Sequence, residues 1–396
     1  MNEEQLYLNF DEYIKASEPH KRERAEAWRV AIGLQAVDGL QVSEYLKQTA
    51  RQHIEGEITI DEAREQIKQY YISKTQHDAD DEEKSEADRV SSNIAKLIGS
   101  PSFTFNAAGV IAIHRGIFEG VFKHAGQLRT YDITKKEWIL RGDTVMYGRW
   151  QDLRIALDYD IEQEKQFDYR GLSMTEVVEH LAKFVSGIWQ THPFCEGNTR
   201  TTAVFAIKYL KSIGFECNND MFEQHSWYFR NALVRANYKN VAKGINQDYS
   251  FLNNFFRNLL MGENHELKNR YMLVNAPEEW KDEASAGQVP HNHPTSTPQV
   301  QDKLNTDNPN IQRLILVVGE KELSVKEIME SLRLKDRKNV LNLYLNPATH
   351  EGYIRLLYPQ SPRHPRQKYL LTVKGLALFN KLKTKQLCQK TTAKTN

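Results

Sequence analysis

Two apolar segments that follow each other closely constrain the fold of this chain more than any other feature. Residues 172–190 carry apolar side chains at helical spacing, and residues 201–215 form a second segment of the same kind. Both are apolar on nearly all sides, which is typical of helices in the middle of a bundle. We therefore predict a mainly α-helical fold with these two helices at its centre. Ser173 and Glu176 have the spacing of a capping box at the start of the first helix.

The chain before this centre predicts further, shorter helices. Residues 25–40 have helical periodicity, and residues 42–71 predict two short helices separated by a glycine. An acidic tract at residues 77–89 is either a solvated linker or the start of an acidic helix. We expect a small N-terminal helical segment over residues 1–75 and a larger domain over residues 76–274.

One segment of the larger domain has a different pattern. Residues 127–148 have arms rich in β-formers on either side of polar turn residues. This pattern predicts a β-hairpin next to the helices.

The composition changes beyond residue 274. Residues 275–310 are rich in Pro, Ser, Thr and Asn and are predicted to be a flexible linker. From residue 311 to the end, the chain has 17 Lys and Arg against 6 Asp and Glu, a net charge of +11. Since the whole chain carries +1, the remainder must carry about −10. This asymmetry indicates a basic module attached to an acidic body.

The basic module, residues 311–385, resembles a winged-helix domain. Residues 323–347 read as a helix–turn–helix, and two predicted strands follow, joined by a Pro-rich tip. Such a domain could contact DNA phosphates, although many winged helices bind proteins instead. Residues 386–396 would form a polar tail. The candidate DNA contacts are Lys335, Arg337, Lys338, Arg363 and Arg366.

Several classes of protein are disfavoured by the sequence. The acidic N-terminus has no apolar core of a signal peptide, and no run of about 18 apolar residues predicts a membrane span. The cysteines, Cys195, Cys217 and Cys388, are isolated, without the spacing of a zinc site. A reducing cytoplasm is the expected compartment.

A compact polar motif, HPFCEGNTR at residues 192–200, lies between the two central helices. Gly197 and Asn198 permit a tight turn, and backbone amides at the start of the next helix would form an anion site. Glu196 would repel a phosphate there unless a cation lies between them, and Mg²⁺ is the natural choice. Arg200 could bind a second phosphate. His192 could take a proton from an attacking hydroxyl. Together these groups predict nucleotidyl transfer to a hydroxyl.

The motif resembles the active-site motif of the Fic-domain family, HPF-x-[DE]-GN-x-R. Residues 114–133 resemble the family's helix leading into its flap, and residues 227–238 resemble a later core helix. The resemblance covers about residues 100–260. It implies a Fic helical bundle with a β-hairpin flap. It also implies transfer of AMP from Mg·ATP to a Ser, Thr or Tyr hydroxyl of a target protein.

The resemblance also implies a role for each motif residue. His192 would be the general base, Phe194 would pack into the core, and Glu196 would hold Mg²⁺. The residues implied to bind the nucleotide are Gly197, Asn198, Thr199 and Arg200.

The motif departs from the family pattern at two positions. Thr199 stands where a glycine is common, which could narrow the anion site. Ala203 stands where many members have a second arginine for the γ-phosphate. Either the γ-phosphate is bound weakly or another cation replaces this arginine, and Arg230 and Arg235 are the candidates.

A hairpin next to the motif could bind the target protein by adding one of its strands to the free edge; the alternative is a hairpin that only covers the bundle. The expected contact residues, taken as exposed or half-exposed, are Leu128, Thr130, Trp138, Ile139 and Val145.

The N-terminal segment looks like the VbhA-type antitoxin segment that restrains some Fic proteins by placing a glutamate against the second motif arginine. Asp38 and Glu55 come near that glutamate position, and the broader similarity favours Asp38. The expected partner position is Ala203, so we expect either steric inhibition or a purely structural helix.

The leading hypothesis is therefore an AMP-transferring enzyme that uses Mg²⁺ and ATP and modifies a cytoplasmic protein. One alternative is a DNA-binding regulator with a degenerate Fic-like body. Another is a Fic enzyme that uses a different nucleotide or phosphate donor. No membrane partner is expected, and a homo-oligomer is left open.

Overall fold

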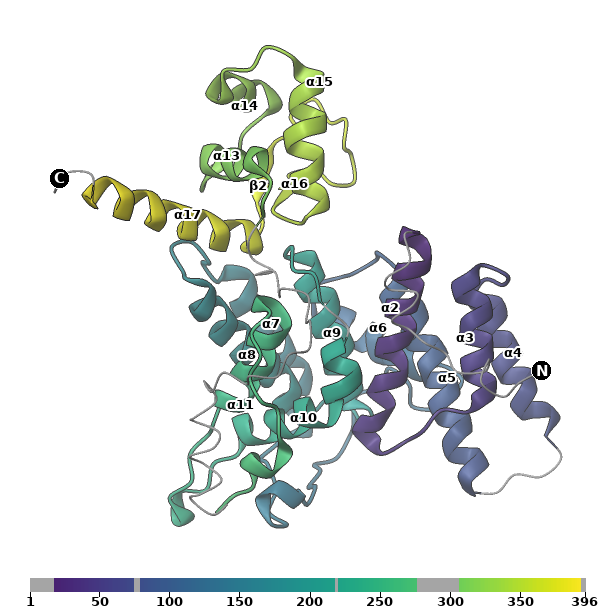
Figure 1. The fold of residues 1–396 in the computed structure, drawn as a ribbon. Coiled ribbons are helices and arrows are strands. Elements are labelled where there is room, and N and C mark those ends of the chain that lie inside the picture. Colours follow the sequence, from purple (N-terminus) through teal and green to yellow (C-terminus); the bar gives the residue numbers. More distant parts are fainter. Residues whose placement is uncertain (1–17, 75–78, 218–219, 276–305, 393–396) are drawn as a thin grey trace, which may run out of the picture.

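A computed structural model describes residues 18–74, 79–217, 220–275 and 306–392, which are mainly α-helical, as predicted (Figure 1). Among these residues, the only strands are β1 (Ile354–Leu356) and β2 (Tyr369–Leu371), which pair antiparallel. The predicted linker, 275–310, lies mostly outside the described residues.

The N-terminal segment forms the predicted short helices. Gly39 and Gly56 adopt the left-handed conformation at φ 75° and 86° and end two of them. Thr59 and Glu62 form a reciprocal capping box at the start of the last. The elements are α2 (Pro19–Gly33), the 3₁₀ turn η2 (Leu34–Asp38), α3 (Glu44–Glu55) and α4 (Ile60–Ser73).

The larger bundle follows, with α8 and α9 at its centre. Every residue of α9 from Asn198 to Leu210 is buried, so the predicted central position is confirmed. Ser173 and Glu176 form the predicted capping box at the start of α8. The main helices are α5 (Ala79–Gly99), α6 (Ala107–Phe118), α7 (Leu153–Gln166), α8 (Met174–Thr191), α9 (Asn198–Ser212), α10 (Asp220–Asn237) and α11 (Ser250–Met261). Short 3₁₀ turns are η3 (Trp138–Leu140), η4 (Trp150–Asp152), η5 (Val241–Lys243) and η6 (Asn269–Met272).

The N-terminal helices and the bundle share one hydrophobic core. Trp28 and Leu34 from the N-terminal segment are fully buried in the same cluster as Phe205 of α9 and Phe229 of α10. The N-terminal segment is therefore an integral layer of the fold.

The acidic tract is the start of helix α5, and part of it is buried. Asp88 is 0% exposed and accepts hydrogen bonds from the backbone N–H of Ser43 (2.9 Å) and the hydroxyl of Tyr71 (2.7 Å). These bonds join α3 and α4 to α5. Burial raises the pKa of Asp88, and the three donors around it compensate a carboxylate that would otherwise be costly to bury.

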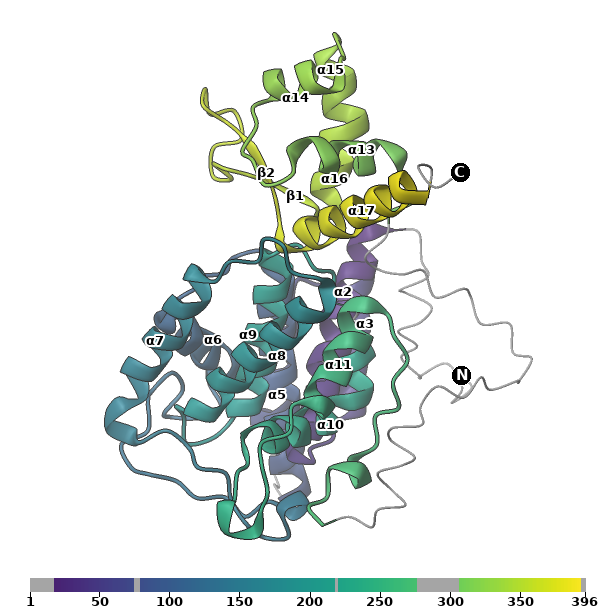
Figure 2. The same ribbon diagram turned by 90° about the vertical axis from the view of Figure 1, so that its left-hand side faces the viewer.

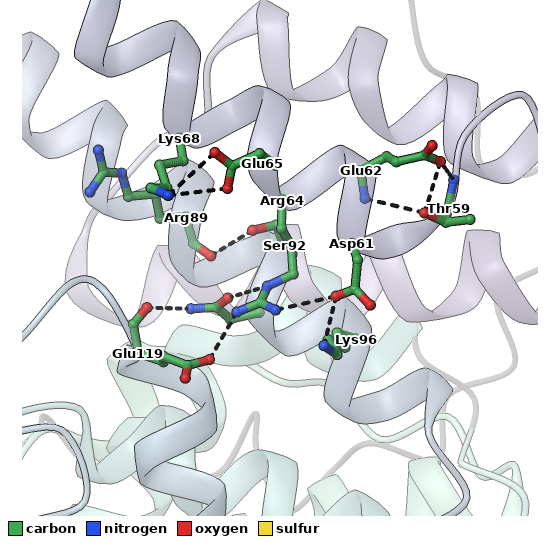
Figure 3. Close-up of polar contacts among 11 residues, drawn as sticks. Thr59, Asp61, Glu62, Arg64, Glu65, Lys68, Arg89, Ser92, Lys96 and Glu119 are labelled. Atoms are coloured by element: carbon green, nitrogen blue, oxygen red, sulfur yellow. Dashed lines mark hydrogen bonds and ion pairs between the residues drawn. The ribbon is translucent and has the colours of Figure 1, made fainter.

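A polar network on the surface strengthens the same junction (Figure 3). The guanidinium of Arg64 on α4 donates to Asn93 of α5 (2.8 Å) and to Glu119 after α6 (3.0 Å). Asp61 pairs with Lys96 at 2.7 Å. Exposed ion pairs contribute little individually, so the shared core, rather than this network, holds the N-terminal helices.

The predicted β-hairpin at residues 127–148 is not formed by regular strands. The chain does reverse there, with Glu137 N–H donating to Asp143 O (2.9 Å), but no strand is present. The arms form no strand ladder with each other, and their ends bond to the motif region: Arg129 N–H donates to Pro193 O (2.9 Å), and Gly148 N–H donates to Gln190 O (3.2 Å). The segment is a loop laid across the end of α8, and we call it the flap loop.

The C-terminal module has the predicted order of helix–turn–helix and hairpin, around a second hydrophobic core. Ser324 and Glu327 form a capping box, and Asp336 caps the next helix. A π-helical segment precedes Pro347, which cannot donate a backbone hydrogen bond. The elements are α13 (Pro309–Val318), α14 (Val325–Leu332), α15 (Arg337–Val340), the π segment η7 (Leu341–Leu345), α16 (Asn346–His350) and α17 (Val373–Thr392).

The C-terminal module contacts the bundle through the start of α17, which lies between the two in both views (Figures 1 and 2). Ala377 belongs to the first core, and the amide of Asn380 donates to Leu172 O (2.9 Å). Gly214 and Gly352 pass so closely that a Cβ on Gly214 would lie 2.2 Å from the carbonyl oxygen of Gly352. The module is therefore docked on the ends of α8 and α9.

Candidate active site

His192 ends helix α8 in the left-handed conformation, at φ 47° and ψ 57°, which is uncommon for a residue other than glycine. Its side chain is buried, and Nδ1 lies 3.3 Å from the carbonyl oxygen of Trp189. A hydrogen bond from Nδ1–H to that carbonyl leaves Nε2 as the basic nitrogen. Nε2 is buried and has no hydrogen-bond partner among the described residues. Burial, together with the charge of Lys135, lowers the pKa of His192, which keeps the ring neutral.

The flap loop holds the backbone of His192 through Arg129. This side chain is fully buried, and its guanidinium donates to the carbonyls of His192 (2.8 Å), Tyr131 (2.7 Å) and Gly148. Three carbonyls from three stretches of chain thus converge on one cation. Arg129 fixes the geometry of the motif histidine without itself lining the cavity.

The turn before α9 requires glycine at position 197. Gly197 has φ +70°, and a Cβ there would lie 2.1 Å from Cζ of Phe118. The side chain of Asn198 closes the turn: it accepts from Phe194 N–H (3.0 Å) and donates to Phe194 O (2.7 Å). Helix α9 has no side-chain cap, so its first amides are available to an anion. Asn198 would therefore act through its backbone.

Phe194 packs in the core, as predicted. It stacks on the ring of His114 at 3.7 Å between centroids. His114 accepts from Gly126 N–H at Nδ1 (2.8 Å), and its Nε2 lies 3.2 Å from the carbonyl oxygen of Glu196. Burial lowers the pKa of His114 to about 4, so the ring is neutral. Its contacts with Phe194 and with the carbonyl of Glu196 support the turn.

The Glu196 side chain is exposed at the turn, and its carboxylate is the motif's only candidate metal ligand. No group of three or more His, Cys, Asp or Glu side chains in the described part of the chain is placed to enclose a metal ion. A Mg²⁺ ion held by one carboxylate together with phosphate oxygens and water needs no such group, so the residues present fit it.

Arg200 is buried, and two of its guanidinium nitrogens donate hydrogen bonds, whereas Nε has an ion-pair contact but no hydrogen bond. Nη1 donates to Gln35 (3.1 Å) and Nη2 to Glu86 (2.9 Å), while Nε lies 2.8 Å from the carboxylate of Asp38. The expectation that Asp38 faces position 203 is therefore wrong, because the carboxylate lies against the first motif arginine. Ala203 is 0% exposed in the core and does not line the cavity beside His192.

The cavity beside His192 is small, with a volume of about 40 Å³. It has room for a few water molecules, whereas pockets for small ligands usually measure about 300–1,000 Å³. Its lining joins the motif, the flap loop, η2 and α10: Asp38, Lys135, Glu137, Tyr147, Trp189, His192, Gly197, Asn198, Thr199 and Arg230.

Two larger hollows, of about 570 and 590 Å³, lie on α3 and α4 and share Tyr45 and Gln66. They contain no motif residue, so the cavity with the chemical groups is the better candidate site despite its size.

The two proposed substitutes for a second arginine lie in different places. Arg230 lines the cavity and pairs with the buried Glu137 at 2.8 Å. Arg235 lies outside the lining and pairs with Asp248 at 3.7 Å. Sequence reasoning missed Lys135, Glu137 and Tyr147, whose only signal was their place in the segment predicted as a hairpin.

The residues predicted to bind a target divide into exposed and buried groups. Ile139 and Val145 are buried in the core, so the expectation that they are available to a partner is wrong. They lie inward because the flap loop packs flat on the bundle. Thr130 is exposed, Trp138 is 46% exposed, and Leu128 is half-buried.

The five basic candidates of the C-terminal module are all exposed. Lys335, Arg337 and Lys338 lie at and just before the start of α15, and Arg363 and Arg366 lie in the loop that joins β1 to β2. None of the described helices is both long and apolar enough to cross a membrane.

Comparisons with known proteins agree with this organisation. Residues 104–210 match the model of the Fic/DOC family. Residues 309–372 match the model of the C-terminal domain of proteins described as "Filamentation induced by cAMP protein Fic-like". A curated protein of Escherichia coli (strain K12), "Probable protein adenylyltransferase Fic", is 29% identical over 117 residues, which are 29% of this chain and 54% of the relative. The match thus spans about half the length of that relative.

Among the solved structures that this chain matches is a Fic family protein from Desulfovibrio desulfuricans G20, with 16% identity over 92% of both chains and a TM-score of 0.38. Another is BepC, a VirB-translocated effector of Bartonella tribocorum with bound AMPPNP. It has 19% identity over 42% of this chain and 80% of that chain, with a TM-score of 0.33.

Proposed function

We propose that this chain, whose residues 104–210 match the Fic/DOC family model, is a protein adenylyltransferase that is inhibited by its own N-terminal segment. The observation that carries the proposal is the buried, unbonded Nε2 of His192 in a cavity bounded by the first residues of α9. A neutral imidazole nitrogen beside free helix amides suits proton removal from a hydroxyl next to a bound phosphate.

In the proposed reaction, a Ser, Thr or Tyr hydroxyl of a target protein attacks the α-phosphorus of ATP. Nε2 of His192 takes the hydroxyl proton, the new oxygen–phosphorus bond forms, and the bond to the β-phosphate breaks to release pyrophosphate. The amides of Asn198, Thr199 and Arg200 would stabilise the negative charge on the α-phosphate. Mg²⁺, held by Glu196 with phosphate oxygens and water, would offset the charge of the leaving group.

The flap loop would position the target. Thr130 and Trp138 are exposed near the motif, and a target backbone held along them would bring its hydroxyl toward His192. Leu128 would pack beneath that contact.

Inhibition by the N-terminal segment is supported by the surroundings of Arg200. Asp38 and Gln35 of η2 lie against two of its nitrogens. The carboxylate of Asp38 also lines the cavity, whose volume of about 40 Å³ is too small for a nucleotide. A bound phosphate would have to displace Asp38 to reach Arg200.

A direct test is to incubate the wild-type protein and the Asp38→Ala variant with Mg²⁺ and α-labelled ATP, GTP, CTP or UTP in turn. Label should pass from ATP to the protein itself or to a protein of a cell lysate, and more strongly with the variant. Transfer from another nucleotide alone would replace ATP as the donor. No transfer from any nucleotide by either folded protein would reject the proposed function.

The C-terminal module is a second candidate for function, as a DNA-binding unit. The five exposed cations on α15 and in the β1–β2 loop favour this role. Binding of the full chain to labelled duplex DNA should weaken steeply with salt, and replacing Arg337 and Lys338 by Gln should reduce the salt slope. Binding that changes neither with the salt concentration nor with these two substitutions would reject DNA as the partner.

A further inference from the structure

Lys135 is a cation of the cavity that has no close anionic partner. The charges of the two arginines at this site are balanced by carboxylates. Arg200 pairs with Asp38 and Glu86, and Arg230 pairs with Glu137. The ammonium of Lys135 makes no hydrogen bond and no ion pair within 4 Å with the described residues, although it lines the cavity. The Lys135 side chain is half-buried, so its ammonium keeps part of its contact with water and is available to an anionic group of a ligand that enters the cavity.

The placement of Lys135 is set by the flap loop. Its backbone N–H lies 3.3 Å from the hydroxyl of Thr144, across the chain reversal at residues 137–143. The ammonium is close enough to Asp38, Glu137 and Glu196 for their charges to act on it, and its own charge acts on His192. Lys135 therefore lies between the carboxylate that covers Arg200 and the motif histidine.

Asp38 stands where an anionic ligand would lie. Its carboxylate pairs with Arg200 at 2.8 Å, and its charge also acts on Lys135, so one negative group attracts two cations. A phosphate that displaces Asp38 would meet the same two cations. Helix α9 provides no further cation there, because position 203 is a buried alanine.

We propose that the ammonium of Lys135 binds the terminal phosphate of the nucleoside triphosphate donor, in place of the second arginine that α9 lacks. This inference rests on the proposed function, because it requires a triphosphate in the cavity. Arg230 is the weaker alternative, since its guanidinium is already held by two contacts with Glu137, at 2.8 and 3.1 Å. Lys135 can turn to the ligand without breaking an existing pair.

The test compares ATP with AMP, which lacks the terminal phosphates. Calorimetry would measure the binding of both nucleotides to Lys135→Met and Lys135→Arg in the Asp38→Ala background, and the exposed neighbour Lys136→Met is the matched control. Lys135→Met should weaken ATP binding by about tenfold to a hundredfold and leave AMP binding unchanged. Lys135→Arg should keep most of the preference for ATP, and Lys136→Met should keep all of it.

Equal ATP affinity in Lys135→Met and Lys136→Met would overturn the inference and leave the proposed function standing. An equal loss for ATP and AMP would also overturn it, because the contact would not be to a terminal phosphate. If the Asp38→Ala protein is folded but neither binds a nucleotide nor transfers label, the proposed function fails together with the inference.

Discussion

The carboxylate of Asp38 lies 2.8 Å from Nε of Arg200, although 162 residues separate them in the chain. The guanidinium that would bind a phosphate in the proposed reaction is thus already paired inside the protein. The Cζ atom of Arg200 lies 4.8 Å from the centre of the Phe118 ring, and this cation–π contact helps to hold the guanidinium in its orientation. In this structure, therefore, Arg200 is occupied by carboxylates and a phosphate could reach it only by displacing Asp38.

Replacing Asp38 by alanine should raise nucleotide affinity and transfer activity by about tenfold or more. The reason is that a phosphate no longer has to displace a carboxylate that is paired with a buried arginine, and a tenfold change in affinity corresponds to about 1.4 kcal/mol. Calorimetry with ATP and labelling by α-labelled ATP measure the two effects. Glu55→Ala is the matched control, because Glu55 pairs with Lys21 at 3.0 Å and does not line the cavity. Equal activation by both variants would contradict a specific role of Asp38.

Replacing His192 by alanine should abolish transfer and spare nucleotide binding, because in the proposed reaction Nε2 would contact the target hydroxyl rather than the phosphates. Loss of a general base typically costs about 10²–10⁴-fold. Single-turnover labelling and calorimetry on the same protein separate the two quantities. A variant that transfers at the wild-type rate would exclude the base role.

The pH dependence of the transfer rate should follow the lowered pKa of His192. A base must be unprotonated to act, and burial lowers the pKa of this ring well below 6.5. The rate should therefore stay level as the pH falls from about 8 to 6.5 and decline only at lower pH. A rate already halved near the ordinary histidine pKa of about 6.5 would show that the imidazole is not shielded during the reaction.

Replacing Arg129 by methionine should lower the transfer rate more than the ATP affinity. The guanidinium fixes the carbonyl of His192 and two carbonyls of the flap loop, and its loss leaves three buried acceptors without donors. Arg149→Met is the control, since Arg149 is 72% exposed and pairs with Asp152 at the surface. A parallel drop in thermal stability, rate and affinity would indicate a general structural role instead.

Replacing Ala203 by arginine should destabilise the protein and not tighten ATP binding. From the sequence alone, an arginine there would be expected to restore a γ-phosphate contact. Ala203 is 0% exposed in the core, so the larger, charged side chain should cost at least about 2–4 kcal/mol. Thermal melting and calorimetry check this expectation. A variant with wild-type melting and tighter ATP binding would show that position 203 can reach the ligand.

A chain that ends near residue 275 should still transfer AMP, because no residue lining the cavity lies beyond Arg230. Its melting temperature should fall, since the truncation uncovers the part of the bundle that α17 contacts through Ala377 and Asn380. Thermal melting and labelling of the truncated and full-length proteins provide the comparison. A truncated protein that is folded and inactive would show that the C-terminal module completes the site.

Local signals predicted much of the fold. The capping boxes at Thr59, Ser173 and Ser324 depend on residues three apart, and the two central helices were visible from their continuous apolar pattern. Of the predicted motif residues, His192, Gly197, Asn198 and Thr199 line the cavity, whereas Glu196 and Arg200 do not, and the chemical roles of all six stay predictions.

Long-range relationships were not predictable from these signals. Asp38 and Glu86 come to Arg200 only because η2 and α5 pack against α9, and nothing in their local sequence marks them as its partners. The flap loop was taken for a hairpin because its arms contain β-forming residues. Its backbone groups instead bond to residues 190–193. Local propensity cannot predict that these long-range bonds replace strand pairing within the loop.

The core that α2 shares with the bundle limits how Asp38 can move away from Arg200. Trp28, Val30 and Leu34 are fully buried, so departure of the whole N-terminal segment would expose large apolar surface to water. The end of α2 is also pinned, since Ser226 donates to Gly33 O (2.8 Å). Between Gly33 and the start of α3 at Glu44 lie η2, whose Leu34 and Val37 are themselves buried, and residues 39–43. Activation would thus be a local movement within residues 34–43 that takes the half-exposed Asp38 away from Arg200 while the rest of the N-terminal segment stays in place.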